Sequence, residues 1–175
     1  FGVIYAGAQK NIGPAGVTLV IVRKDLLDLV DENTPTMQKW STHAKKDSLF
    51  NTGHCWAIYM CMLSLEYLKE FGGVNAMEKQ NRKKANLLYD VIDTSKGFYK
   101  GHAEKDSRSW MNVTFNLETP ELEETCVAEA AKRNLIGLKG HRSVGGMRAS
   151  IYNAMSMDGV NTLVEFLQEF KEEHQ

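Results

Sequence analysis

Apolar and polar residues change their spacing along the chain. Two short apolar runs near the start, residues 3–6 and 17–22, are rich in β-branched side chains and predict two buried strands. Further along, apolar residues recur at helical spacing over 55–71 and again over 75–92, with a glycine pair between the two stretches. The first half of the sequence therefore predicts strands followed by two long helices.

The segment between these strands and helices is more polar. Residues 24–31 predict a short amphipathic helix. Residues 32–48 contain Pro35 and few regularly spaced apolar positions, which predicts a long loop.

The pattern changes after the second long helix. Residues 98–99 and 111–117 alternate as half-buried antiparallel strands, and Pro120 opens a helix that runs to about residue 134. Residues 147–152 predict another strand and 160–170 a closing amphipathic helix. This order predicts a small α+β domain. We place the domain boundary near Gly73.

Composition narrows the class of protein. Of the 175 residues, 43% are hydrophobic and 25% are charged, as in an ordinary globular protein. The formal net charge of −1 argues against nucleic acid or a membrane surface as a partner. No apolar run approaches the roughly 18 residues that a membrane helix needs. The three cysteines are too few for a disulfide framework and too irregular for a metal site, so we predict a cytoplasmic protein without a metal.

The first residues of the sequence predict a strand that is already in progress. We therefore expect the chain to be a part of a longer protein. A missing targeting signal then carries no information, because the true amino terminus can lie elsewhere.

Lys10 is the first candidate for chemistry, and it lies in a loop of glycines and alanines between the two predicted strands. A lysine in such a loop is most often a solvated surface residue. The small neighbours nevertheless allow the backbone to turn tightly and a bulky group to approach. An amine between buried strands is also easily desolvated, which makes it a better nucleophile toward an aldehyde.

A second group of candidates is cationic and is interspersed with glycines. Its members are Lys139, His141, Arg142 and Arg148. Arginine presents a planar fork that binds phosphate or carboxylate oxygens through two hydrogen bonds, and glycines allow backbone N–H groups to face an anion. A solvated basic loop fits the spacing equally well. A nucleic-acid patch is disfavoured, because no aromatic residues alternate with the cations.

The exact amino-acid sequence of both segments is more specific than their composition. Residues 5–17, Tyr-Ala-Gly-Ala-Gln-Lys-Asn-Ile-Gly-Pro-Ala-Gly-Val, closely resemble the lysine segment of phosphoserine aminotransferases, which belong to the class V branch of fold-type I pyridoxal-phosphate enzymes. Residues 141–150, His-Arg-Ser-Val-Gly-Gly-Met-Arg-Ala-Ser, resemble the substrate-binding segment of that family. The similarity runs through essentially the whole chain and covers about half of a full enzyme.

The resemblance implies an α/β fold and two domains. Residues 1–73 correspond to the carboxy-terminal part of a large mixed-sheet domain that binds pyridoxal phosphate, and residues 74–175 to a small α+β domain. Lys10 would hold pyridoxal phosphate as a Schiff base and act as the catalytic residue, and Gln9 would contact the cofactor phosphate. The missing amino-terminal half would supply the rest of the cofactor site.

The resemblance also implies how the substrates bind. His141 and Arg142 would bind the substrate phosphate, and Arg148 would bind the α-carboxylate. Asn51 and Thr52 suit a helix N-cap. In the family the matching pair reaches the cofactor phosphate of a partner subunit, which implies a homodimer. The residues that follow the pair depart from the usual proline-containing sequence, so we expect a less rigid loop here.

The implied reaction transfers an amino group from glutamate to 3-phosphohydroxypyruvate, giving O-phosphoserine and 2-oxoglutarate in L-serine biosynthesis. Two alternatives stay open. One is another class V enzyme, such as an alanine–glyoxylate aminotransferase or a cysteine desulfurase, neither of which needs a phosphate clamp. The other is a truncated, catalytically incompetent chain that acts at most as a dimer partner.

Overall fold

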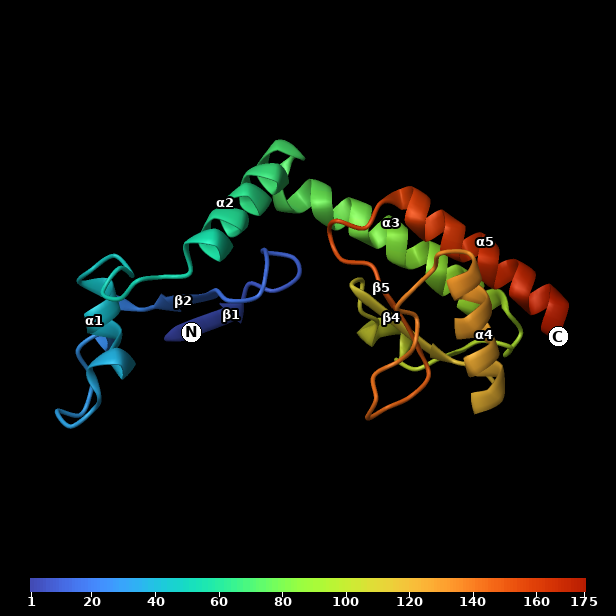
Figure 1. Ribbon diagram of the computed structural model, residues 1–175, viewed down its shortest axis with the longest axis horizontal. Helices are drawn as coiled ribbons and strands as arrows, with labels where there is room; N and C mark the ends of the chain where they lie inside the picture. The colour runs from blue at the N-terminus through green and yellow to red at the C-terminus, as the bar shows by residue number, and fades with distance from the viewer. The chain divides into compact units, whose positions relative to one another are not determined.

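A computed structural model describes residues 1–175 and divides them into two compact units (Figure 1). The first unit comprises Phe1–Glu70 and the second Phe71–Gln175. The division falls just before Gly73, where the sequence predicts a domain boundary. None of the helices combines the length and the apolar character that crossing a membrane requires.

The first unit is built on a β-hairpin. Strands β1 (Val3–Gly7) and β2 (Thr18–Val22) pair antiparallel, with Val3 opposite Val22 and Gly7 opposite Thr18. The elements that follow are two 3-10 turns at Lys24–Leu26 and Thr36–Gln38, the short helix α1 (Trp40–Ala44) and the long helix α2 (Cys55–Glu70).

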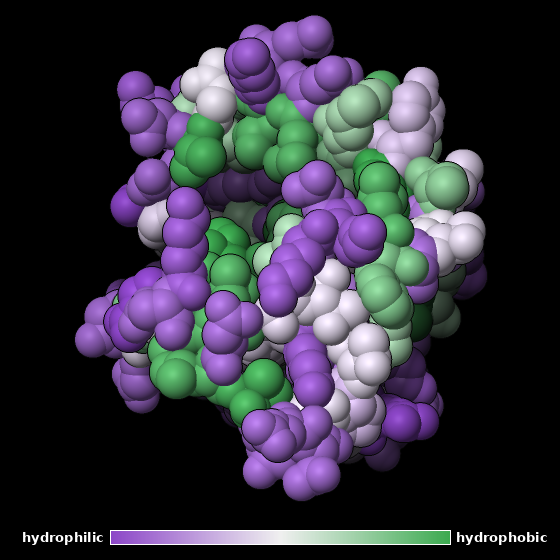
Figure 2. All heavy atoms as spheres, turned by 90° about the vertical axis from the view of Figure 1, so that its left-hand side faces the viewer, coloured by the Kyte–Doolittle hydropathy of each residue, from purple (hydrophilic) through white to green (hydrophobic).

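The prediction that both strands are buried is wrong for this chain. All residues of β1 are exposed, and in β2 only Val22 is half-buried. The reason is that the two-stranded sheet has no third strand and that the helices of the unit leave its apolar side chains open. Figure 2 shows hydrophobic residues lying among hydrophilic ones at the surface.

Two further predictions for the first unit are wrong. The helix expected over 24–31 is only the 3-10 turn Lys24–Leu26, and the loop expected over 32–48 contains α1. Residues 24–31 and the five residues of α1 are too few for a helix that is stable by itself, so their conformation depends on local contacts rather than on periodicity.

The second unit contains a three-stranded antiparallel sheet in the order β3–β4–β5. Its strands are β3 (Lys100–Gly101), β4 (Asn112–Asn116) and β5 (Met147–Ser150). Along β4 and β5 buried apolar residues alternate with half-buried and mostly polar ones, such as Thr114 and Arg148. One face of the sheet therefore joins the core, and the opposite face carries polar side chains.

Three helices complete the second unit. They are α3 (Gly73–Thr94), α4 (Pro120–Lys132) and α5 (Met157–His174). Helices α3 and α5 lie side by side, as Figure 1 shows, and α4 contributes Cys126 and Ala130 to the same core. Large aromatic side chains fill this core, and the hydroxyl of Tyr99 donates to the carbonyl of Leu167 at 2.7 Å.

Most predicted elements of the second unit are confirmed, although their ends differ. The helix that was expected to open at Pro120 does so, with the hydroxyl of Thr119 accepting the Leu122 N–H at 3.2 Å. The strand predicted at residues 98–99 is displaced to β3, because Tyr99 is buried in the core and its N–H donates to the hydroxyl of Ser95 at 3.0 Å.

A buried lysine fixes the turn between β5 and α5. Lys84 on α3 is fully buried, and its ammonium group donates to three backbone carbonyls, those of Ile151 at 3.2 Å, Tyr152 at 2.9 Å and Met155 at 3.1 Å. Burial lowers the pKa of Lys84. The ammonium has three N–H donors, and each has a carbonyl acceptor, so the charge is compensated by hydrogen bonds.

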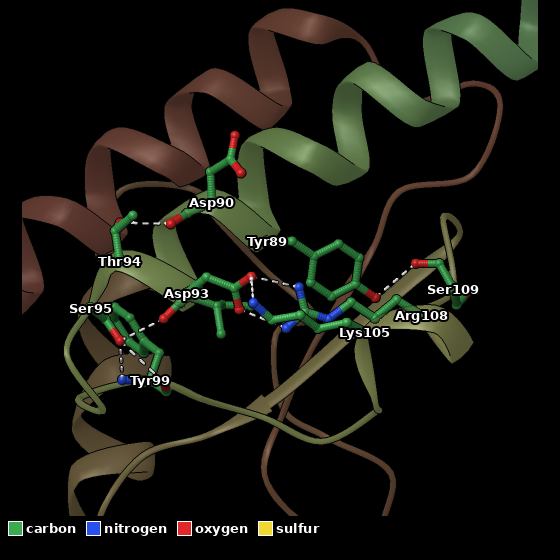
Figure 3. Close-up of polar contacts among 10 residues, drawn as sticks. Tyr89, Asp90, Asp93, Thr94, Ser95, Tyr99, Lys105, Arg108 and Ser109 are labelled. Atoms are coloured by element: carbon green, nitrogen blue, oxygen red, sulfur yellow. Dashed lines mark hydrogen bonds and ion pairs between the residues drawn. The ribbon is translucent and has the colours of Figure 1, made fainter.

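An ion pair closes the opposite end of α3 over the chain that leads into β4 (Figure 3). Arg108 donates to both carboxylate oxygens of Asp93, at 2.9 and 2.6 Å, and its guanidinium lies 4.4 Å from the ring centroid of Tyr89. The hydrogen bond from Arg108 holds the pKa of Asp93 below its usual range. The Tyr89 hydroxyl in turn donates to the carbonyl of Ser109 at 2.8 Å.

Candidate active site

The loop that carries Lys10 joins β1 to β2 and is closed at its base. The Ala8 N–H donates to the Val17 carbonyl, and the Gly13 N–H donates to the Ala8 carbonyl, both at 2.9 Å. The Lys10 N–H donates back to the Gly13 carbonyl at 2.9 Å. Backbone hydrogen bonds within the loop therefore fix the position of Lys10.

Lys10 has a strained backbone. Its φ angle is 100°, a value that residues with a side chain rarely adopt. Such strain persists only where the surrounding structure imposes it, and it is concentrated at functional sites. The desolvation expected for this residue is not found, because Lys10 is exposed in this chain, as are the strands on either side of it.

A glycine allows the lysine loop to rest on α2. A Cβ atom at Gly13 would lie 2.6 Å from the Sγ of Cys61 and 3.1 Å from its Cα, and Cys61 is buried in α2. Any larger residue would push the loop away from the helix. The predicted cofactor contact Gln9 is exposed beside Lys10, and its backbone forms a bridge with that of Gly13.

Asn51 and Thr52 lie before α2 and are exposed. Their expected capping role is wrong, because α2 begins at Cys55 and His54 takes the capping position. The Nδ1 atom of His54 accepts the N–H of Ala57 at 3.3 Å. The side chains of Asn51 and Thr52 therefore play no part in starting the helix.

The cationic segment of the second unit forms a loop. Its base, which we call the neck, consists of residues 138–140 and 146–148 and is closed by backbone hydrogen bonds. The Arg148 N–H donates to the Leu138 carbonyl, and the Gly140 N–H donates to the Gly146 carbonyl, both at 2.7 Å. A Cβ atom at Gly140 would lie only 2.0 Å from the carbonyl oxygen of Gly145, so the neck can close only with glycine at this position.

His141 and Arg142 lie at the exposed tip of this loop. The His141 carbonyl accepts the N–H groups of Val144 at 2.9 Å and Gly145 at 2.8 Å, which forms a tight turn. The Nδ1 atom of His141 accepts the Ser143 N–H at 3.3 Å. A backbone N–H can only donate, so this contact favours the tautomer with the proton on Nε2, which leaves that N–H able to donate to an anion.

Arg148 lies on the polar face of the sheet, where β5 pairs it with Thr114. Its Nε atom is buried and has no hydrogen-bond partner within the protein. A buried guanidinium donor without an acceptor costs free energy, which suits this arginine to an anionic ligand. A carboxylate fits, because its two oxygens match the fork of the guanidinium group.

A pocket of about 490 Å³ lies between α4 and the cationic loop. Its walls carry acidic and basic residues, with Glu123 and Glu124 on the helix and Lys139, His141 and Arg142 on the opposite side. The surroundings of the loop are therefore not uniformly basic, because carboxylates line the same pocket.

The candidate residues thus fall into two groups, one in each unit. The first unit holds Gln9, Lys10, Asn51 and Thr52, and the second holds His141, Arg142 and Arg148. Two residues that no sequence pattern predicted lie behind the cationic loop: Asn116 on β4 packs against Gly146, and Glu123 on α4 contacts Asn116. No local motif marks these two residues, because their contacts arise only when strand and helix are folded together.

Comparison with known proteins identifies the family to which the chain belongs. Residues 1–163 match the family described as aminotransferase class-V. The phosphoserine aminotransferase of Bacillus subtilis strain 168 is 56% identical over 175 residues, which are 100% of this chain and 49% of that protein. The chain therefore spans about half the length of the curated relatives it matches.

Solved structures show the same likeness. The phosphoserine aminotransferase from Bacillus circulans subsp. alkalophilus matches with a TM-score of 0.97 at 49% identity, over 100% of this chain and 48% of that chain. The PLP-bound phosphoserine aminotransferase from Trichomonas vaginalis matches with a TM-score of 0.88 at 36% identity, over 95% of this chain and 48% of that chain. These matches confirm the predicted α/β fold class.

Proposed function

The chain belongs to the class V aminotransferases, and from this premise we propose that it provides the carboxy-terminal half of a phosphoserine transaminase. This enzyme transfers an amino group from glutamate to 3-phosphohydroxypyruvate, giving O-phospho-L-serine and 2-oxoglutarate, a step of L-serine biosynthesis. The observation that carries the proposal is a pair of features close together in the chain: the exposed loop tip with His141 and Arg142, and the buried Nε of Arg148 on β5, which has no hydrogen-bond partner in the protein.

Pyridoxal phosphate is the cofactor of the proposed reaction, and the lysine loop fits it. When bound, it supplies an electron sink for the negative charge that develops at the substrate Cα. Lys10 holds the cofactor covalently and, once its amine is free, carries the proton that leaves Cα. The strained backbone of Lys10 and the small residues around it support this role. Gln9 contacts the cofactor phosphate.

The second unit orients the substrate. His141, through its Nε2–H, and Arg142 bind the phosphate of the phosphorylated substrate, and the same two side chains bind the side-chain carboxylate of glutamate. Arg148 binds the α-carboxylate. Two anion sites define the direction in which the substrate lies, and with it the direction of its Cα–H. Alanine–glyoxylate aminotransferases and cysteine desulfurases do not need a cationic tip for phosphate, which favours the phosphorylated substrate.

The proposal extends to assembly and location. The first unit forms a part of the large cofactor-binding domain, and the second is the small domain. The active protein is a homodimer in which Asn51 and Thr52 reach the cofactor phosphate of the partner subunit; both residues are exposed and outside the helix cap, which leaves them available. The protein works in the cytoplasm, and its three free cysteines suit a reducing compartment.

The cofactor role of Lys10 is tested by borohydride reduction with pyridoxal phosphate, followed by peptide mapping. We expect a pyridoxyl adduct confined to Lys10, absent from Lys10→Ala, and lost on pre-incubation with phosphoserine but not with serine. The experiment is run on this chain and on the full-length protein. An adduct in the full-length protein alone would show that this chain needs the other half of the site. No adduct at Lys10 in either would overturn the proposal.

The phosphate clamp is tested with Arg142→Ala. Loss of charged hydrogen bonds to the substrate phosphate should raise the KM for phosphorylated substrates by about 10- to 100-fold. Arg142→Lys keeps the charge but loses the fork, so its KM should be intermediate. Cofactor trapping at Lys10 is the control and should not change. An equal loss of substrate and cofactor binding would contradict the assigned role.

A further inference from the structure

We propose that Asn116 and Glu123 are positioning residues that hold the cationic loop, residues 140–146, in the shape that binds the substrate phosphate. This inference rests on the proposed function, because it assigns a role to residues behind the phosphate clamp. Neither residue needs to touch the substrate. Their effect reaches His141 and Arg142 through three successive contacts.

The first contact lies between Asn116 and the neck of the loop. Asn116 is the last residue of β4. A Cβ atom at Gly146 would lie 2.5 Å from the Nδ2 of Asn116 and 3.0 Å from the Phe115 carbonyl oxygen. The loop backbone therefore packs against the Asn116 amide more closely than a residue with a side chain could. The orientation of this amide consequently decides where the neck can lie.

The second contact fixes that orientation. The Oε1 atom of Glu123 accepts the Nδ2–H of Asn116 at 3.3 Å and the Leu117 N–H at 3.2 Å. Glu123 lies on the first turns of α4, whose start is fixed by Pro120 and the capping hydroxyl of Thr119. The carboxylate is therefore presented from a rigid element, and it connects the helix to the end of β4.

The third contact transmits the position of the neck to the tip. The Gly140 N–H donates to the Gly146 carbonyl at 2.7 Å, and no space for a Cβ remains at Gly140. His141 follows directly, and its carbonyl accepts the Gly145 N–H at 2.8 Å. A shift at Gly146 must therefore move His141 as well.

The charge of Glu123 supports a positioning role over a direct one. Glu123 lines the same pocket as His141 and Arg142, and a carboxylate would repel a bound phosphate. The two N–H groups that Oε1 accepts hold the carboxylate against the end of β4. Glu124 is the natural control, because it lines the same pocket and is exposed.

The test uses the full-length holoenzyme and inorganic phosphate as the probe of the clamp. We expect Asn116→Ala and Glu123→Ala to raise the inhibition constant of phosphate and the KM for 3-phosphohydroxypyruvate by about tenfold, as expected for misplaced hydrogen bonds to an anion. The value of kcat and the trapping of pyridoxal phosphate at Lys10 should stay unchanged. Glu123→Gln keeps a carbonyl acceptor, and Glu124→Ala leaves the contact with Asn116 intact, so neither should raise the two constants; the loss of a repelling carboxylate from the pocket can only lower them.

A purely structural role would give a different result. A lower thermal midpoint with unchanged phosphate inhibition in Asn116→Ala and Glu123→Ala would overturn the inference, and so would an equal effect of Glu124→Ala. If an alanine variant does not fold, Asn116→Ser replaces it, since its short side chain no longer reaches Glu123. If Arg142→Ala weakens phosphate binding but these variants do not, only the positioning role fails. If Arg142→Ala has no effect either, the proposed phosphate clamp fails.

Discussion

The two units bury their apolar residues to very different degrees. In the second unit, helices and sheet enclose a continuous core that includes Tyr99, Phe115, Phe166 and Phe170. In the first unit only Ala8, Ala57 and Cys61 are buried among the apolar residues, while most side chains of its hairpin are open. The second unit thus has the features of an independent folding unit, and the first does not.

This difference also separates the two candidate roles. The residues proposed to bind anions in the second unit lie on a loop with a closed neck and on a sheet whose other face is a packed core. Lys10 lies on a hairpin whose order depends on the loop's own hydrogen bonds and on the contact of Gly13 with Cys61. The residues proposed to bind the substrate therefore lie on a frame packed against a core, whereas Lys10, the proposed cofactor lysine, is held in this chain by a small number of local contacts.

The largest expected effect comes from separating the two units. We expect residues 71–175 to unfold in one cooperative transition, since a continuous core is present. Residues 1–70 should show no such transition and should bind a hydrophobic dye, because little apolar surface is buried. Denaturant titration followed by circular dichroism measures both. A cooperative transition in the shorter fragment would remove the contrast between the units.

Loss of the Lys84 ammonium should destabilise the second unit strongly. Lys84→Ala removes the shared donor of three backbone carbonyls, through one buried and two partly buried hydrogen bonds, and we expect the free energy of unfolding to fall by roughly 3–5 kcal/mol. Lys83→Ala is the matched control, because Lys83 is the exposed neighbour on the same helix, and its change should stay within about 0.5 kcal/mol. Equal effects of the two variants would contradict the role of the buried lysine.

Gly13→Ala should disturb the first unit alone. The added Cβ would meet the Sγ and the backbone of Cys61, at a cost of roughly 1–3 kcal/mol. Hydrogen exchange should speed up at the amides of residues 8–13 and not in the second unit. Gly7→Ala is the control, since no atom lies within 4 Å of a Cβ placed there. Faster exchange in both variants would argue against the contact with Cys61.

Local chemistry predicted the second unit better than the first. Proline and a hydroxyl mark the start of α4 in the sequence, and helical periodicity indicates α3 and α5, so these elements could be read directly. In the first unit a continuous apolar run at residues 17–22 predicts burial, but such a run reports only that a strand needs cover. It does not say which part of a chain supplies the cover.

The features that most support the candidate site could not be read from the sequence. The positive φ of Lys10 arises from hydrogen bonds that close its loop. The unpaired Nε of Arg148 depends on burial by the folded sheet. These positions were predicted from their residue types and from the family resemblance. Backbone strain and unsatisfied hydrogen-bond donors, by contrast, arise only when segments distant in the sequence pack together. The cap of α2 shows the same limit, because His54 is an unusual capping residue.

The smallest expected effect concerns acid stability and belongs to the second unit. Arg108 lowers the pKa of Asp93 in the folded state, so this carboxylate adds stability above its unfolded pKa of about 3.9. That contribution is lost as the pH falls through the lower pKa that Asp93 has in the folded state. Because the pair is partly exposed, we expect it to be worth less than about 1 kcal/mol.

Denaturant titrations of residues 71–175 between about pH 5 and pH 2 measure this contribution. An asparagine at position 93 has no carboxylate for acid to protonate. The free energy of unfolding of Asp93→Asn should therefore fall less steeply as the pH is lowered than that of the wild type. Asp90→Asn is the control, because Asp90 lies one turn earlier on α3, is exposed and takes no part in the pair with Arg108 (Figure 3). If both variants weaken the pH dependence of the free energy of unfolding equally, the effect comes from net charge. It then does not come from the ion pair between Asp93 and Arg108.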